Sequence, residues 1–418
     1  MIYAVLKILS RLTILGYFRK VKIVGRDQIP KKGPYIFVAN HPSAFMDPIV
    51  VATSIRPPVH FIAAGEYVGK GVKGWLFQKL FHSIPVFRPS TRPEEAHKNK
   101  DTFTKCHEHL VKKGALVIFP EGVSLTEKKL KPLKTGTVRI AIGAEALCNF
   151  ELDVPIIPIG LNYSDPHAFR SDLFVKIGKP IYINKYLTAE SKTDKEEQIK
   201  VTRKITDILQ DEMQKTILHL DSEQEEELLE KLDSVFSRDL KTELNISYKD
   251  QEGEFAMHKN FIDAMEFFKS ENPNLYANTE EKLDNYLQLL KKNELSDKDI
   301  GAFNERYRYR RVLTYILGLP FFLFGFIHNI IPYRLVGFIG NKLKVGATFI
   351  GSMSLAIGLV IFLLWYTAIS ISAAKLGLGW IALSYPVLMY ITGLYALLYN
   401  TAIQQSRQRN KLRELTKT

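Results

Sequence analysis

The chain has 418 residues, of which 46% are hydrophobic and 24% are charged, and this balance excludes global disorder. Two cysteines, Cys106 and Cys148, exclude a disulfide framework and indicate free thiols in a reducing compartment. The net charge of +13 predicts an anionic partner, and since no nucleic-acid module is recognisable, we expect a membrane surface or a phosphorylated substrate and no nucleic acid.

The first segment, residues 1–20, is apolar but is interrupted by Lys7 and Arg11. Its unbroken apolar runs are therefore too short to cross a bilayer. We expect an interfacial helix that lays its apolar face on a membrane. A terminal helix of the protein core is the alternative.

Residues 21–185 alternate between β-rich runs and helical stretches such as 93–113 and 138–147. The β-rich runs are residues 35–39, 59–63, 84–87, 115–119, 155–162 and 173–177. This alternation predicts an α/β fold with a mostly parallel sheet flanked by helices. In such sheets, functional residues gather in the loops beyond the strand ends.

Residues 186–311 are polar and charged, and Ile205, Leu209 and Met213 recur at the spacing of one helix face. We find no catalytic motif in this region. The composition predicts a helical middle region that acts as a spacer or lid.

A membrane domain is expected at residues 312–406, which contain three uncharged stretches: 312–333, 345–374 and 376–406. Each stretch is long enough to span the hydrocarbon core. If all three crossed, basic clusters would fall on both sides of the membrane, against the positive-inside rule. We therefore predict a re-entrant first segment, which Pro320 and His328 favour, and a transmembrane hairpin of the other two. The basic tail, residues 407–418, then faces the cytoplasm.

The chemical motif of the chain follows the run 35–39, where His41 and Asp47 stand just before a predicted helix. A histidine titrates near neutral pH and can take a proton from a hydroxyl, and a carboxylate can orient its ring. The alternative is structural, because Asp47 followed by Pro48 is also typical of a helix N-terminus.

Three further segments follow this motif in order: residues 84–88, 119–124 and 154–160. With the segment from His41 to Asp47, they resemble the glycerolipid acyltransferase family of glycerol-3-phosphate and lysophosphatidate acyltransferases. Each segment is short, but four in this order are specific. The resemblance covers residues 20–185 and leaves out the middle region.

The resemblance implies that residues 21–185 are a catalytic domain. The predicted topology places this domain on the cytoplasmic face of a cytoplasmic or inner membrane. His41 would be the general base, Asp47 would orient it, and the acceptor oxygen would attack the acyl thioester directly. Acyl-CoA or acyl carrier protein would be the donor, and no metal or other cofactor would be needed. The acceptor would be glycerol phosphate or a lysophospholipid, as in phospholipid biosynthesis.

Four substrate-binding residues are also implied by the resemblance. Arg88 would hold the acceptor phosphate, and Lys134, in a basic stretch, is a second candidate for this contact. Glu121 and Gly122 would shape the acceptor site.

One departure from the family pattern concerns the spacing, since five residues separate His41 from Asp47 where the family usually has four. On a regular helix one added residue rotates the side chain by about 100°. The loop must therefore bulge if the two side chains are to meet. This departure leaves the identity of the acceptor open, and another lysolipid or an aminolipid is an alternative. It also leaves open a non-catalytic lipid-binding or scaffold protein. A transporter is disfavoured, because the apolar stretches carry no charge.

Overall fold

The structure of the chain is a computed structural model that describes residues 2–68, 82–87, 92–247, 249–295, 297, 308–343 and 345–415. It divides into two compact units. The first comprises Met1–Asp221 together with Gly346–Ser352, and the second comprises Ser222–Val345 together with Met353–Thr418. The motif at His41 lies in the first unit.

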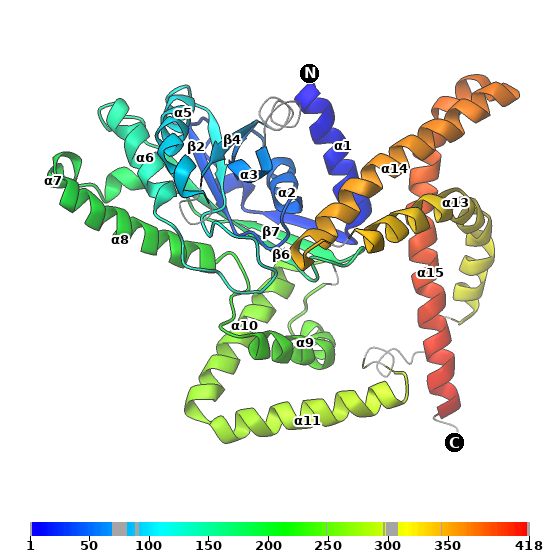
Figure 1. The fold of residues 1–418 in the computed structure, drawn as a ribbon. Coiled ribbons are helices and arrows are strands. Elements are labelled where there is room, and N and C mark those ends of the chain that lie inside the picture. Colours follow the sequence, from blue (N-terminus) through cyan, green and yellow to red (C-terminus); the bar gives the residue numbers. More distant parts are fainter. Residues whose placement is uncertain are drawn as a thin grey trace. The chain divides into compact units, whose positions relative to one another are not determined.

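A mixed, mostly parallel sheet forms the centre of the first unit (Figure 1). Its strands are β1 (Lys20–Val24), β2 (Tyr35–Ala39), β3 (His60–Ala64), β4 (Ser83–Val86), β5 (Ala115–Ile118), β6 (Pro155–Tyr163), β7 (Asp172–Ile177) and β8 (Ile181–Tyr182). The order is β1-β7-β6-β2-β5-β3-β4, and β8 pairs with β6. Only β7 and β8 run antiparallel to their neighbour β6, whereas the other described pairs are parallel. The predicted α/β architecture is confirmed.

Helices cover the sheet on both faces. They are α1 (Ile2–Tyr17), α2 (Met46–Ser54), α3 (Gly65–Val68), α5 (Asn99–Val111), α6 (Gly136–Leu147), α7 (Ala189–Thr193) and α8 (Lys195–Gln214). Ile36 and Leu116 of the strands are fully buried in one core cluster with Leu110 of α5 and Ile140 of α6. Because side chains alternate along a strand, Phe37 points to the opposite face. Both faces are therefore apolar, as a parallel sheet requires.

The first unit extends beyond the domain end that we expected at residue 185. Ile205, Leu209 and Met213 of α8 are buried in the same core cluster as the strands. The apolar face predicted from their spacing therefore packs on the sheet unit, and the unit continues to Asp221.

Helix α1 has apolar side chains on two sides. Ile14 and Tyr17 are buried, whereas Val5, Ile8 and Leu12 are among the exposed large hydrophobic residues. The exposed apolar stripe is compatible with the predicted interfacial helix. The buried side is compatible with the alternative, a terminal helix of the protein core.

The second unit begins with three polar helices, α9 (Glu223–Glu243), α10 (Gln251–Glu271) and α11 (Pro273–Lys292). Side-chain contacts join them, including an ion pair of Lys231 with Asp284 at 2.6 Å and a hydrogen bond between His258 and Asp233 at 2.6 Å. The helical middle region is thus present, and its role as a spacer or lid stays a prediction.

Three apolar helices complete the second unit: α13 (Arg308–Lys342), α14 (Ile350–Ala373) and α15 (Tyr385–Leu415). Three segments of the described residues, Thr314–Lys342, Ile350–Leu383 and Tyr385–Gln404, are long and apolar enough to cross a membrane. Whether the first of them crosses or re-enters stays a prediction.

Helix α13 runs without interruption through Pro320 and Pro332. The amide of Asn329 donates to the carbonyl of Met389 on α15 at 3.1 Å, and it accepts from the Tyr366 hydroxyl of α14 at 2.6 Å. The side chain of Asn329, a polar residue within this segment, is therefore satisfied by neighbouring helices.

Candidate active site

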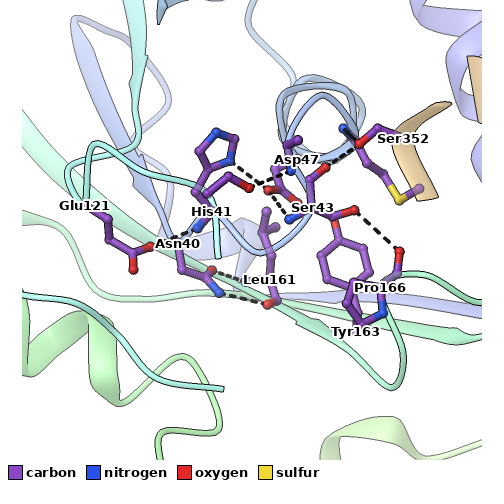
Figure 2. Close-up of polar contacts among 12 residues, drawn as sticks. Asn40, His41, Ser43, Asp47, Glu121, Leu161, Tyr163, Pro166 and Ser352 are labelled. Atoms are coloured by element: carbon purple, nitrogen blue, oxygen red, sulfur yellow. Dashed lines mark hydrogen bonds and ion pairs between the residues drawn. The ribbon is translucent and has the colours of Figure 1, made fainter. Parts of the chain in front are cut away.

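The loop that carries His41 is fixed at the carboxyl end of the sheet by Asn40. Strand β2 ends at Ala39, and the Asn40 amide donates to the Leu161 carbonyl at 3.0 Å and accepts from the Leu161 amide at 2.7 Å. These two bonds attach the loop to β6, the neighbour of β2. Figure 2 shows both bonds beneath His41.

His41 and Asp47 are in direct contact. The distance from His41 Nδ1 to Asp47 Oδ2 is 2.8 Å, and Asp47 is fully buried (Figure 2). In the neutral ring, the carboxylate keeps the proton on Nδ1 and leaves Nε2 as the acceptor. No described residue hydrogen-bonds Nε2, and the side chain is 20% exposed. The ring also stacks on Phe119 with centroids 4.2 Å apart. This arrangement presents a proton acceptor to a bound molecule.

The chain accommodates the five intervening residues by a bulge, as the sequence requires. Ala44 adopts a left-handed conformation with φ of 39°, and the Met46 amide donates to the Ser43 carbonyl at 2.9 Å. Helix α2 starts at Met46, so Asp47 is its second residue and not its N-cap. The Asp47 carboxylate instead accepts from the Ser43 amide at 2.7 Å, which closes the bulge onto the carboxylate.

Tyr163 is a third donor to Asp47, at 2.8 Å from its hydroxyl to Oδ1. Burial raises the pKa of Tyr163 well above its ordinary value, and the negative charge of Asp47 raises it further. The phenol therefore stays protonated and donates. We did not predict Tyr163 from the sequence, although it lies at the end of β6, on the same face as Leu161 by the two-residue period.

Glu121 supports the loop from the other side. Its Oε1 accepts from the His41 amide at 2.9 Å, and its Oε2 accepts from the Lys131 amide at 3.1 Å. Burial raises the pKa of Glu121, and the two amides and nearby His41 oppose that rise. Both carboxylate oxygens of Glu121 thus bond backbone amides, those of His41 and Lys131. In this position Glu121 supports the loop, whereas the resemblance implies that it shapes the acceptor site.

Gly122 and Lys134 lie together. Gly122 has a φ of 72°, and a Cβ atom there would collide with Lys134 Nζ. The ammonium group therefore lies over the glycine backbone, next to Glu121. Lys134 is exposed, and no carboxylate of the described residues lies within ion-pair distance of it. Its charge is available to an anionic group.

Arg88 lies outside the described residues, so its phosphate contact stays a prediction. Strand β4 ends just before it, at Val86, and the Phe87 backbone makes two hydrogen bonds with the Asn99 side chain, at 2.8 and 2.6 Å. Since β4 is parallel to β3, its end lies at the carboxyl edge of the sheet, as the end of β2 does.

A model of the family described as Acyltransferase matches residues 20–162. Asn40, His41, Asp47, Glu121 and Lys134 all fall within this match. Residues 20–162 are thus an acyltransferase domain by their similarity to this family. The acyltransferase domain accordingly contains the strand β2, the bulge and the turn at Gly122.

Curated relatives agree with this assignment. Glycerol-3-phosphate O-acyltransferase 1 of Saccharomyces cerevisiae is 25% identical over 42% of this chain and 34% of its own length. The chloroplastic 1-acyl-sn-glycerol-3-phosphate acyltransferase BAT2 of Brassica napus is 32% identical over 40% of this chain and 47% of its own length. The chain thus spans less than half the length of either relative.

Among solved structures, the 1-acyl-sn-glycerophosphate (LPA) acyltransferase PlsC from Thermotoga maritima is similar at 21% identity. The likeness covers 48% of this chain and 79% of that chain, with a TM-score of 0.33.

Two residues that contact the site lie beyond the matched range of the acyltransferase domain. Tyr163 follows it directly, and Ser352 comes from the start of α14, where its hydroxyl bonds the backbone of Ser43. The two-residue period of a strand, which places Tyr163 on the same face as Leu161, could have identified Tyr163 from the sequence. No signal in the sequence pointed to Ser352.

Proposed function

We propose that this chain is a membrane-bound O-acyltransferase of phospholipid biosynthesis. The donor is acyl-CoA or acyl carrier protein, and the acceptor is glycerol 3-phosphate or 1-acylglycerol 3-phosphate. The observation that carries the proposal is the 2.8 Å contact between His41 Nδ1 and buried Asp47, which leaves Nε2 open as a base.

The reaction needs one proton transfer in each direction. Nε2 of His41 takes the proton from the acceptor hydroxyl while its oxygen attacks the carbonyl carbon of the thioester. The new C–O bond forms and the C–S bond breaks. The imidazolium, which Asp47 stabilises, then returns the proton to the leaving thiolate. Neither a metal nor another cofactor takes part in this sequence.

The acceptor class is supported by the charge at the site. Lys134 places an ammonium group beside the Gly122 backbone, and phosphate is the anion that such a group binds well. The named acceptors of the yeast and plant relatives are glycerol 3-phosphate and 1-acyl-sn-glycerol 3-phosphate. Arg88 is the second proposed phosphate contact, by its place in the family pattern.

A fatty acyl donor is supported by apolar side chains near His41. Phe45, Val123 and Leu125 are exposed large hydrophobic residues, and the Leu125 amide donates to the His41 carbonyl at 3.1 Å. The three apolar helices support a bilayer as the source and destination of the lipid. The basic segments around them support a cytoplasmic face.

The test uses the purified full chain in lipid nanodiscs, with labelled oleoyl-CoA or palmitoyl-acyl carrier protein. The acceptors are glycerol 3-phosphate, 1-acylglycerol 3-phosphate and lysophosphatidylcholine, and products are identified by mass spectrometry. We expect acylation of the phosphate monoesters, and a loss of about 10³-fold in turnover for His41→Ala. The control is His97→Ala, which changes an exposed histidine of the same domain.

Equal turnover in His41→Ala and wild type would refute His41 as the base. Lipid binding without turnover for any acceptor would identify the non-catalytic alternative. Acylation of lysophosphatidylcholine alone would move the acceptor to another lysolipid class.

A further inference from the structure

The short segment Gly346–Ser352 belongs to the compact unit that contains the sheet. It comprises a 3₁₀ turn (Ala347–Phe349) and the first three residues of α14. Ser352 is 3% exposed, and its hydroxyl makes two hydrogen bonds. It donates to the Ser43 carbonyl at 2.6 Å and accepts from the Met46 amide at 3.1 Å (Figure 2).

These two backbone groups are the ends of the bulge between His41 and Asp47. Ser43 and Met46 also bond each other at 2.9 Å, and Ala44 between them has the left-handed φ of 39°. The amide of Ser43 in turn donates to Asp47. A non-glycine residue in the left-handed region is strained, so the surrounding contacts must hold it there. Ser352 supplies two of those contacts.

The segment is shaped for close approach to the bulge. A Cβ atom on Gly351 would collide with the Pro166 carbonyl and would lie 3.3 Å from the Met46 side chain. Phe349 packs against Phe45, with ring centroids 5.6 Å apart. Only a glycine before Ser352 allows the hydroxyl to reach the loop at this distance.

The bulge is held from a second direction by the acyltransferase domain itself. The Ala44 amide donates to the Ser124 hydroxyl at 2.9 Å. Ser124 lies inside the residues matched by the family, whereas Ser352 lies far outside them. The longer spacing between His41 and Asp47 is therefore accommodated with the help of a residue outside the matched range.

We propose that Ser352 is a positioning residue for the reaction: it holds the bulge so that Asp47 keeps His41 in the orientation for proton transfer. This inference rests on the proposed function, since it assigns Ser352 a part in the same site. It also makes the first turn of α14, a helix apolar enough to cross a membrane, a part of the active site.

The first experiment measures steady-state kinetics of Ser352→Ala in the full chain. We expect kcat to fall by roughly 10-fold with KM for both substrates within about 2-fold, because the base is misplaced while the substrate contacts remain. The matched control is Ser372→Ala on the same helix, whose hydroxyl bonds only the Ala368 carbonyl among the described residues. Wild-type kcat in Ser352→Ala would overturn the proposal.

A double variant distinguishes positioning from a general structural role. If Ser352 acts through Asp47, then Ser352→Ala should cost little further activity in an Asp47→Asn background. A loss by the same factor in both backgrounds would overturn the assignment.

Hydrogen–deuterium exchange provides a readout that does not need turnover. Ser352→Ala should speed exchange at the Met46 amide and leave peptides from β6 unchanged. Unchanged exchange at Met46 would overturn the proposal even if activity fell. A wild-type chain without turnover for any acceptor would refute the proposed function, and exchange would then still decide whether Ser352 holds the bulge.

Discussion

Two histidines of the same sheet unit have opposite surroundings. His41 follows the last residue of β2, contacts a buried carboxylate through Nδ1 and leaves Nε2 open. His60 is the first residue of β3, at the other end of the parallel strands. Its ring stacks on His82 with centroids 4.7 Å apart and packs at a tilt against His109 with centroids 4.0 Å apart. Its Nδ1 is buried without a hydrogen-bond partner among the described residues.

The difference lies in which form of the ring each site stabilises. Burial, and to a smaller extent the neighbouring His109 and His82, lower the pKa of His60 to about 4. That ring stays neutral at pH 7 and packs as an aromatic group. His41 instead has a carboxylate partner, with Nδ1 at 2.8 Å from Asp47 Oδ2, and we propose that this contact serves proton transfer at Nε2. The proposed role of His41 as the base therefore depends on its neighbours.

The largest expected effect comes from removing the charge of that partner. Asp47→Asn keeps the shape of the side chain but no longer stabilises an imidazolium, and we expect kcat to fall by about 10²–10³-fold. The matched control is Asp172→Asn, which breaks a surface ion pair with Arg19 at 2.6 Å in the same unit and should change kcat little. Activity of Asp47→Asn within a few-fold of wild type would remove the carboxylate from the mechanism.

A smaller effect is expected at Tyr163. Tyr163→Phe leaves Asp47 Oδ1 without its buried donor, and we expect kcat to fall by about 10-fold and stability by about 1–3 kcal/mol. Tyr35→Phe is the control. Tyr35 lies on β2 of the same sheet, and the change removes its hydrogen bond to the Pro30 carbonyl, away from Asp47. Thermal unfolding in detergent and kcat should be measured together. Equal losses of kcat in both variants would show that Tyr163 has no particular link to Asp47.

The smallest effect on activity is expected at His60, where the comparison predicts a change of stability instead. In the unfolded chain its pKa is about 6.5, and in the fold it is about 4. Below pH 6.5 the unfolded chain therefore binds a proton that the folded chain does not, and stability falls until about pH 4. The loss should be about 1–2 kcal/mol, because the ring is partly exposed.

His60→Phe should remove most of this acid sensitivity and leave turnover at pH 7 unchanged. The measurement is the melting temperature at pH 7 and pH 5 for both chains. His109 also has a lowered pKa by burial, so a small pH dependence should remain. The same shift of melting temperature in variant and wild type would show that His60 does not titrate in this range.

Much of the fold was predictable because local patterns decide it. Strand β2 matches its predicted bounds, and the other predicted strands differ by a residue or so at their ends. Strand β1 was missed, since Lys20 and Lys22 alternate with its apolar residues and make the run look polar. The antiparallel pairing of β7 with β6 could not be predicted either, because it depends on a reversal of the chain that composition does not indicate.

The site was predictable only where its residues are close in sequence. The six-residue separation of His41 and Asp47 allowed the bulge to be inferred from the departure from the family spacing together with helix geometry. The contact between Gly122 and Lys134 could not be predicted without knowing the path of the loop that connects them. Ser352 meets Ser43 across 309 residues, and no periodicity or propensity encodes a contact over that distance. The roles of Arg88, Glu121 and Lys134 in binding substrate remain predictions.

Strand β6 gives the active site little tolerance for length changes. Its first half pairs with β2 and its second half with β7. Leu161, which bonds Asn40, and Tyr163, which bonds Asp47, both lie on the second half. Deleting one residue there would turn every following side chain to the opposite face. Over evolutionary time, this strand should therefore accept exchanges of one apolar residue for another, while insertions and deletions accumulate in the loops around it.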